Sequence, residues 1–361
     1  MKTEIISDKE GICLITMFVI GTSGVIVTGL QAKQDLWLSV ILSIFMAFCM
    51  AIIYARLNCI FKGENLFYIL EICFGNIIGK LIGLLYVWYT LHLSCLILRD
   101  FGEFQLVVLK ETPMMVTMMI TAFLGIWVLK DGIEVMGRYA KTFAPLIVIV
   151  VLTLAIMVSN EMQITNLQPI LSQGFKPIMD GAFSAFSFPF GEIVIFTMVF
   201  SKFKNKKFTY NVYVLGLLIS GSIIFITSTA EVLILGVNTC IETYFPGYVT
   251  VGKLDIGDVL QRLEIITTFI FILGGFIKFS VCLLASVNGI AKIFELDDYR
   301  FIVTPMSYAS LNLAYITANS RMSFFDFSLK IYPYYAFPFQ VIIPLILWII
   351  AESRHRKSLN N

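Results

Sequence analysis

Charged residues are scarce in this sequence: Asp, Glu, Lys and Arg together make up 14% of its 361 residues. A soluble domain carries about 25% charged residues. Histidine occurs only as His92 and His355, too few and too isolated for a metal site, and none of the seven cysteines forms a Cys-x-x-Cys pair. No basic patch is interleaved with aromatic residues. These absences argue against a metal centre and against binding to nucleic acid.

Hydrophobic residues, in contrast, reach 58% of the chain, more than a soluble core can bury. A bilayer core of about 30 Å requires roughly 20 apolar residues per helix. We therefore expect an all-α integral membrane protein with about ten transmembrane helices in a single domain over residues 1–361. The predicted spans lie near residues 11–30, 36–55, 78–98, 113–130, 142–159, 180–201, 210–235, 263–289, 301–318 and 336–351.

The segments between the spans indicate surface elements and orientation. A short interfacial helix is predicted at 64–76, and the more polar segment 236–262 is predicted to lie along the membrane surface. Lys and Arg are more numerous in the segments that share a side with the N-terminus, for example in the lysine-rich loop 202–207. By the positive-inside rule, both termini and the short tail 353–361 are predicted to be cytoplasmic.

Ten spans divide into two sets of five, and an odd number of spans reverses the orientation of the second set. The halves, about 8–160 and 175–352, are therefore predicted to form an inverted repeat, and such repeats carry interrupted helices at matching positions. The first span contains Gly21-Thr22-Ser23-Gly24, and the sixth contains Ser187-Phe188-Pro189-Phe190-Gly191-Glu192. Proline removes a backbone N–H and glycine relaxes the backbone, so both helices are predicted to break there.

Backbone groups that a break sets free cannot face lipid, so they line a cavity or meet a ligand. The N-terminus of a half-helix suits a carboxylate, and free carbonyl groups suit an ammonium or a metal cation. An amino acid carries both a carboxylate and an ammonium group. The alternative is that these small residues serve only close packing between helices.

Two charged residues, Glu192 and Lys278, lie well inside predicted spans, where a central charge costs about 2.5–3.5 kcal/mol. We predict that Lys278 is a cation near the central cavity, with Glu192 as its candidate partner. The alternative is a purely structural ion pair between two helices. Towards the outer ends of other spans, Glu231 is predicted to be solvated and the cluster Arg99 to Glu103 to pair locally.

A series of short motifs follows the chain over nearly its whole length. They are Lys33-Gln34-Asp35, Gly79-Lys80-Leu81-Ile82-Gly83-Leu84-Leu85-Tyr86, Arg99-Asp100-Phe101-Gly102-Glu103, Glu111-Thr112-Pro113, Gly132-Ile133-Glu134-Val135, Ser187 to Glu192, Ile256-Gly257-Asp258, Gly274-Gly275-Phe276-Ile277-Lys278, Asp298-Tyr299-Arg300 and Tyr332-Pro333 to Pro338-Phe339. Each is weak alone, but in this order they are specific. They resemble the spore germination B subunits, the permease-like components of endospore nutrient-germinant receptors. The sequence departs from that family at Lys33, where a glycine is frequent.

The resemblance implies membership of the amino acid–polyamine–organocation permease superfamily, and thus a LeuT-like fold of five plus five spans. It implies a nutrient sensor that binds an L-amino acid or similar small germinant in the inner membrane of the spore. Its partners would be a larger A-type membrane subunit and a C-type lipoprotein. The implied ligand-binding residues are Gly21, Thr22, Ser23, Gly24, Phe188, Pro189, Phe190 and Gly191, with Tyr89 and Ser280 as further cavity candidates.

The main alternative function is a proton-coupled amino acid transporter of the same fold, moving protons through Lys278 or Glu192. Both functions need the same cavity, so the sequence does not separate them. An enzyme is not indicated, because no His-Glu-x-x-His motif, nucleophile–base pairing or phosphate-binding loop occurs. We expect no cofactor and no metal; the expected partners are a small germinant, the other receptor subunits and the lipid bilayer.

Overall fold

The computed structural model describes residues 6–61, 64–200, 209–253 and 262–360, which form helices and turns and no extended strand. The α-helices are α1 (Asp8–Ile20), α2 (Leu36–Ile60), α3 (Leu66–Phe74), α4 (Asn76–Val108), α5 (Met114–Asp131), α6 (Ile133–Met157), α7 (Lys176–Ser187), α8 (Phe196–Val199), α9 (Thr209–Leu235), α10 (Val237–Glu242), α11 (Pro246–Gly252), α12 (Glu264–Ile293), α13 (Arg300–Ile316), α14 (Arg321–Asp326), α15 (Tyr332–Phe337) and α16 (Ile343–Asn360). The 3-10 turns are η1 (Leu30–Asp35), η2 (Val158–Glu161), η3 (Ile164–Leu167) and η4 (Phe190–Ile195), and two π-helical turns are η7 (Phe327–Ile331) and η8 (Pro338–Ile342).

Eight helical segments of the described residues are long and apolar enough to cross a membrane. The predictions of an all-α fold and of an integral membrane protein are confirmed. Two of the ten predicted spans contain shorter helices, since α1 has 13 residues and α13 has 17. At 1.5 Å per residue, α1 covers only about 20 Å. The irregular residues 21–29 that follow α1 therefore have to cover part of the bilayer depth.

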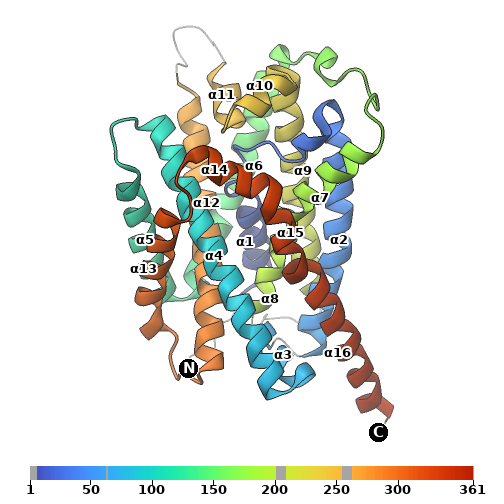
Figure 1. The fold of residues 1–361 in the computed structure, drawn as a ribbon, viewed down its shortest axis with the longest axis vertical. Helices are drawn as coiled ribbons and strands as arrows, with labels where there is room; N and C mark the ends of the chain where they lie inside the picture. The colour runs from blue at the N-terminus through green and yellow to red at the C-terminus, as the bar shows by residue number, and fades with distance from the viewer. Residues whose placement is uncertain (1–5, 62–63, 201–208, 254–261, 361) are drawn as a thin grey trace.

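The first helix is broken where the sequence predicts it. α1 begins with a capping box, in which Ser7 and Glu10 bond each other's backbone N–H groups, and it ends at Gly21. A Cβ atom added at Gly274 on α12 would lie 2.8 Å from the Cα of Gly21. The two glycines thus bring the end of α1 into direct backbone contact with α12, and α1 also packs against α6 and α9 in the middle of the bundle (Figure 1).

The sixth span is broken as well. α7 ends at Ser187, and the chain passes through Phe188 and Pro189 into the 3-10 turn η4 before one further turn of α-helix, α8. Pro189 has no N–H to donate to an α-helical ladder, which explains why the helix stops here. The predicted LeuT-like pattern of broken first and sixth helices is confirmed, whereas the repeat boundaries near 8–160 and 175–352 stay a prediction.

The final span is longer than the sequence predicts. Instead of beginning near 336, it runs as one helical stretch from Arg321 to His355, with two π-helical turns inside it. Pro333 and Pro338 both lie within this stretch, and the π-turns η7, just before Pro333, and η8, which begins at Pro338, accommodate them in the helix. This stretch runs obliquely across the bundle in front of α1 and α8 (Figure 1). It brings the missed segment 321–335 next to the breaks.

The two ends of the bundle differ. Both chain termini and α3 lie at one end, whereas α10 and α11 cover the other end (Figure 1). The predicted interfacial segment 64–76 contains the helix α3, and 236–262 contains α10 and α11; residues 254–261 of that segment lie outside the described residues. The two short helices α10 and α11 therefore form a cap over the end that is opposite to the termini.

Candidate functional site

Two fully buried charges meet at the break of the sixth span. Lys278 Nζ on α12 lies 2.7 Å from Glu192 Oε2 in η4, and both side chains have 0% exposure. The hydroxyl group of Tyr332 donates a hydrogen bond of 2.6 Å to the other carboxylate oxygen, Glu192 Oε1. Lys278 Nζ also lies 3.5 Å from Thr22 Oγ1 and 4.2 Å from the centre of the Phe188 ring. Residues from both breaks thus converge on one ammonium group.

The final helical stretch closes the sixth-span break from the other side. The side chain of Gln340 donates hydrogen bonds to the backbone oxygen of Ser187 (2.8 Å) and to the hydroxyl of Tyr89 (3.0 Å). The hydroxyl oxygens of Tyr89 and Tyr332 are 3.4 Å apart. The broken helix leaves the backbone oxygen of Ser187 without its helical hydrogen bond. Gln340 supplies a replacement hydrogen bond to this oxygen.

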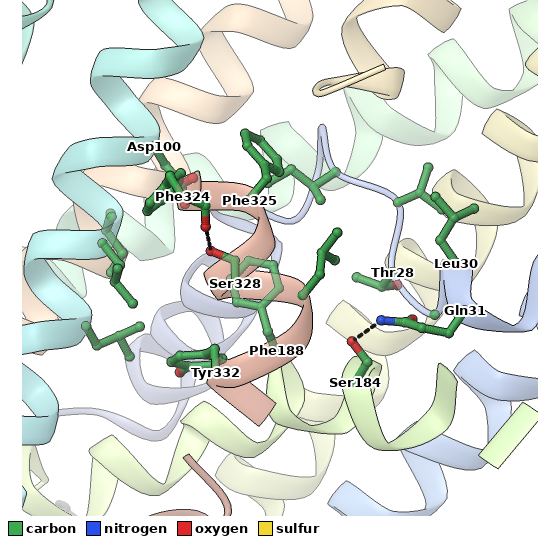
Figure 2. A pocket seen from close by; sticks show the side chains of 17 residues that line it. Thr28, Leu30, Gln31, Asp100, Ser184, Phe188, Phe324, Phe325, Ser328 and Tyr332 are labelled. Carbon is green, nitrogen blue, oxygen red and sulfur yellow. Dashed lines mark hydrogen bonds between the residues drawn. The ribbon is translucent and has the colours of Figure 1, made fainter. Parts of the chain in front are cut away.

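A cavity of about 70 Å³ lies beside this network. Its walls are the irregular segment 26–31, one face of α4, the end of α7, and the final stretch from Phe324 to Tyr332. The side chains of Phe188 and Tyr332 line it and also contact the Lys278–Glu192 pair. Figure 2 shows these two rings at the floor of the cavity. They connect the cavity to the buried ion pair.

The polar groups of the cavity lie on opposite walls. Asp100 on α4 is 8% exposed, lines the cavity and makes no hydrogen bond or ion pair with any residue that the structure describes. On the opposite side, Gln31 Nε2 donates a 2.9 Å hydrogen bond to Ser184 Oγ (Figure 2). Ser328 Oγ donates to the backbone oxygen of Phe324 at 3.0 Å. A carboxylate without a partner therefore faces amide and hydroxyl groups across an otherwise apolar space.

Comparisons with known proteins place this chain in a family. The family model described as "Spore germination protein" matches residues 5–322. The chain belongs to this spore germination permease family. Spore germination protein KB of Bacillus subtilis is 27% identical over 99% of this chain and 98% of its own length. Spore germination protein A2 of the same organism is 24% identical over 89% of this chain and 87% of its own length.

A solved structure shares the fold of this spore germination permease. Mhp1, a nucleobase-cation-symport-1 family transporter in a closed conformation with bromovinylhydantoin bound, matches with a TM-score of 0.66 at 12% identity. The match covers 90% of this chain and 75% of the Mhp1 chain. The match shows that this chain has a LeuT-like transporter fold. At 12% identity it does not indicate which ligand the chain binds.

The predicted residues of the first break lie at different places in this permease. Thr22 contacts Lys278, whereas Gly21 packs against the backbone of α12. The hydroxyl of Ser23 donates to the backbone oxygen of Val19, so it closes the last turn of α1. Gly24 lines a second, separate cavity. Of these four residues, Thr22 alone has a described contact with the buried pair.

In the sixth break, Phe188 lines the cavity of about 70 Å³, Pro189 precedes the turn η4, and Phe190 is buried in the core. Gly191 lies against the final stretch, since a Cβ atom there would be 2.5 Å from Gln340 Oε1. Among the remaining candidates, Tyr89 belongs to the Gln340 network. Ser280 is buried on α12, and its hydroxyl has no hydrogen-bond partner in the described part of the chain.

Sequence reasoning missed Asp100, Tyr332 and Gln340. Asp100 was expected to pair with its neighbours, but Arg99 and Arg321 both bind Glu103, at 2.7 and 2.8 Å, and leave Asp100 to the cavity. The available signal was the order of the charges: Arg99 can pair with Glu103 four residues later, which leaves Asp100, the residue after Arg99, without this partner. Tyr332 was missed because it lies before the predicted start of the final span near 336. Gln340 lies inside the predicted span 336–351, but nothing in the sequence marked it as a residue that would meet the sixth-span break.

Proposed function

We propose that this spore germination permease is the nutrient-sensing subunit of a germinant receptor and that it binds a small amino acid in the cavity between the broken helices. One observation carries the proposal: the Asp100 carboxylate is nearly buried, faces this cavity and has no hydrogen bond or ion pair within the described part of the chain. A buried carboxylate left unpaired is costly. A ligand that brings an ammonium group removes that cost.

The opposite wall supplies donors for the ligand carboxylate. Gln31 uses one N–H for Ser184, so its second amide N–H and the hydroxyl hydrogen of Ser184 are available. The volume of about 70 Å³ and the apolar lining by Leu93, Leu96 and Ile97 favour a small amino acid with a short apolar side chain. Recognition of the ammonium group at one wall and of the carboxylate at the other favours a zwitterionic ligand.

The signal leaves the cavity through Phe188 and Tyr332. Both side chains line the cavity and also contact the Lys278–Glu192 pair, so a ligand that moves them changes the environment of that pair. A ligand shifts a conformational equilibrium only by its different affinity for the two states. In this proposal the liganded state is read by a larger A-type membrane subunit and a C-type lipoprotein in the inner membrane of the spore. The termini then lie on the core side, which fits their common end of the bundle (Figure 1).

A second candidate function is a proton-coupled amino acid transporter. The buried Lys278–Glu192 pair favours it, because ionisable groups inside a membrane bundle mark ion and proton pathways. The fold shared with Mhp1 is compatible with both functions. Transport and sensing differ in whether the bound amino acid crosses the membrane.

Direct binding of a panel of L-amino acids to the purified chain tests the proposal. We expect saturable binding of a small apolar amino acid, with at least a tenfold loss in the Asp100→Asn variant. Asp297→Asn removes an exposed carboxylate after α12 and serves as the matched control with unchanged affinity. Equal affinity of Asp100→Asn and wild type contradicts the site. Uptake of the labelled ligand into vesicles containing this chain alone supports the transporter and contradicts sensing.

A further inference from the structure

A second cavity, of about 50 Å³, lies beneath the cap formed by α10 and α11. Its lining includes Gly24 at the first break, Glu231 on α9, Thr250 on α11 and Thr267 on α12. Apolar residues of α6 complete the wall. The cavity is separate from the buried pair, because Thr267 precedes Lys278 by eleven residues, about 16 Å along α12.

Three side chains of this cavity have buried oxygen atoms without a hydrogen-bond partner among the residues that the structure describes. They are Glu231 Oε2, Thr250 Oγ1 and Thr267 Oγ1, and each residue is 4% exposed. The prediction that Glu231 is solvated is therefore wrong, because α11 folds over the outer end of α9. Native proteins rarely leave such atoms unsatisfied, and three around one space indicate that something binds there.

Two further oxygen atoms meet at Gly247 of α11. A Cβ atom added there would lie 2.7 Å from Glu231 Oε1 and 3.1 Å from the backbone oxygen of Gly24. The residues that line the cavity include no Lys, Arg or His, and Glu231 has no ion pair within the described ranges. A buried carboxylate without a counter-charge is strongly unfavourable. The arrangement thus presents one negative charge and several oxygen donors to an enclosed space.

We propose that this cavity binds a single Na⁺ ion between Glu231, Thr250 and Thr267, with the backbone oxygen of Gly24 as a further ligand. Carboxylate, hydroxyl and carbonyl oxygens suit hard cations, whereas soft transition metals prefer thiolate or imidazole. One carboxylate neutralises one positive charge, so a monovalent ion fits better than a divalent one. The volume holds an ion and at most a few water molecules.

The ion gives the cap a role in ligand binding. The backbone N–H of Gly247 donates a 3.2 Å hydrogen bond to the oxygen of Val25, so α11 is already attached to the irregular segment after α1. Residues 26–31 of the same segment form a wall of the cavity of about 70 Å³. Na⁺ bound at Glu231 holds α9, α11 and α12 against this segment and thereby fixes that wall.

Binding of ²²Na⁺ to the purified full-length chain, with choline replacing Na⁺ at constant ionic strength, tests the site. We expect saturable binding of one ion per chain, weakened at least tenfold by Glu231→Gln. Thr267→Val keeps the side-chain shape without the hydroxyl and should weaken binding about three- to tenfold. Glu242→Gln removes an exposed carboxylate on the neighbouring helix α10 and should leave binding unchanged.

A second measurement guards against misfolded variants. The thermal unfolding midpoint of the wild type should rise with Na⁺ concentration, that of Thr267→Val should rise only at about three- to tenfold higher concentrations, and that of Glu231→Gln should stay unchanged over the range that stabilises the wild type. Saturable ²²Na⁺ binding that Glu231→Gln leaves intact overturns the site. Wild-type protein that neither binds ²²Na⁺ nor gains stability in Na⁺ also overturns it.

Discussion

Lys278 and Glu192, separated by 86 positions in the sequence, form a fully buried ion pair with a nitrogen–oxygen distance of 2.7 Å. The pair joins α12 to the turn η4, and its lysine also reaches Thr22 at the first break. Removing both charges from water is costly, and their attraction offsets the cost only when further hydrogen bonds satisfy them. Tyr332 supplies one such bond to Glu192, and the ring of Phe188 faces the ammonium group.

The first prediction concerns this pair. Lys278→Met leaves the Glu192 carboxylate buried without a counter-charge and should destabilise the protein by about 3–5 kcal/mol. The double variant Lys278→Met/Glu192→Gln should recover most of that loss, because neither charge then remains. Unfolding of the purified variants, arranged as a double-mutant cycle, measures the coupling. Single and double variants of equal stability would contradict it.

The same double variant separates a structural pair from a functional one. If the pair only holds two helices together, the stable double variant should bind amino acid and support germination as the wild type does. If it carries the signal, binding should persist while germination is lost.

Tyr332→Phe tests the connection between cavity and pair. It removes the 2.6 Å hydrogen bond to Glu192 but keeps the ring that lines the cavity. Hydrogen bonds to charged groups contribute about 1.5–3 kcal/mol, so we expect a loss of stability in this range and a change in ligand affinity, both measurable on the purified protein. Tyr334→Phe, at a position 71% exposed, is the matched control. Equal effects of the two substitutions would argue against the connection.

The sequence predicts the breaks better than it predicts the site around them. Gly21, Pro189 and Gly191 act on the backbone locally, so their effect can be inferred from the residues alone. The partners of Lys278 depend on how the helices around it rotate, and the sequence supplied only Glu192. Gln340 and Tyr332 enter through a helical stretch whose prolines are accommodated by π-turns, a tertiary solution that local propensity does not predict. Glu231 was misplaced because its burial depends on α11 folding back over the end of α9, a tertiary contact that the pattern of the span itself does not reveal.

Gly191→Ala should disturb the closure of the sixth-span break. Its Cβ atom would lie 2.5 Å from Gln340 Oε1 and 3.1 Å from the backbone oxygen of Phe186. Gln340 then has to move, and it loses its bonds to Ser187 and Tyr89, so we expect about 1–3 kcal/mol of destabilisation and weaker ligand binding. The double variant Gly191→Ala/Gln340→Ala removes the side-chain clash but does not restore the hydrogen bonds of Gln340.

The pair of variants therefore separates crowding from hydrogen bonding. If Gln340→Ala alone destabilises the protein as much as Gly191→Ala, and the double variant is no worse, the bonds of Gln340 account for the effect. If the double variant is more stable than Gly191→Ala alone, crowding dominates. Wild-type stability of both single variants would contradict the described closure.

The contact between α1 and α12 can be tested by a glycine substitution, Gly274→Ala. A Cβ atom at Gly274 would lie 2.8 Å from the Cα of Gly21, and that neighbour is backbone, which cannot rotate away as a side chain can. Gly274→Ala should therefore force α12 away from the end of α1 and destabilise the protein by about 1–3 kcal/mol or more. Gly252→Ala is the control, because nothing lies within 4 Å of its added Cβ atom. Thermal unfolding of both variants in the same detergent measures the difference.

The same substitution also tests ligand binding. Because Gly274 lies one turn before Lys278 on α12, displacement of this helix should weaken amino acid binding. An unchanged affinity in a destabilised Gly274→Ala protein would show that the first break does not shape the ligand cavity.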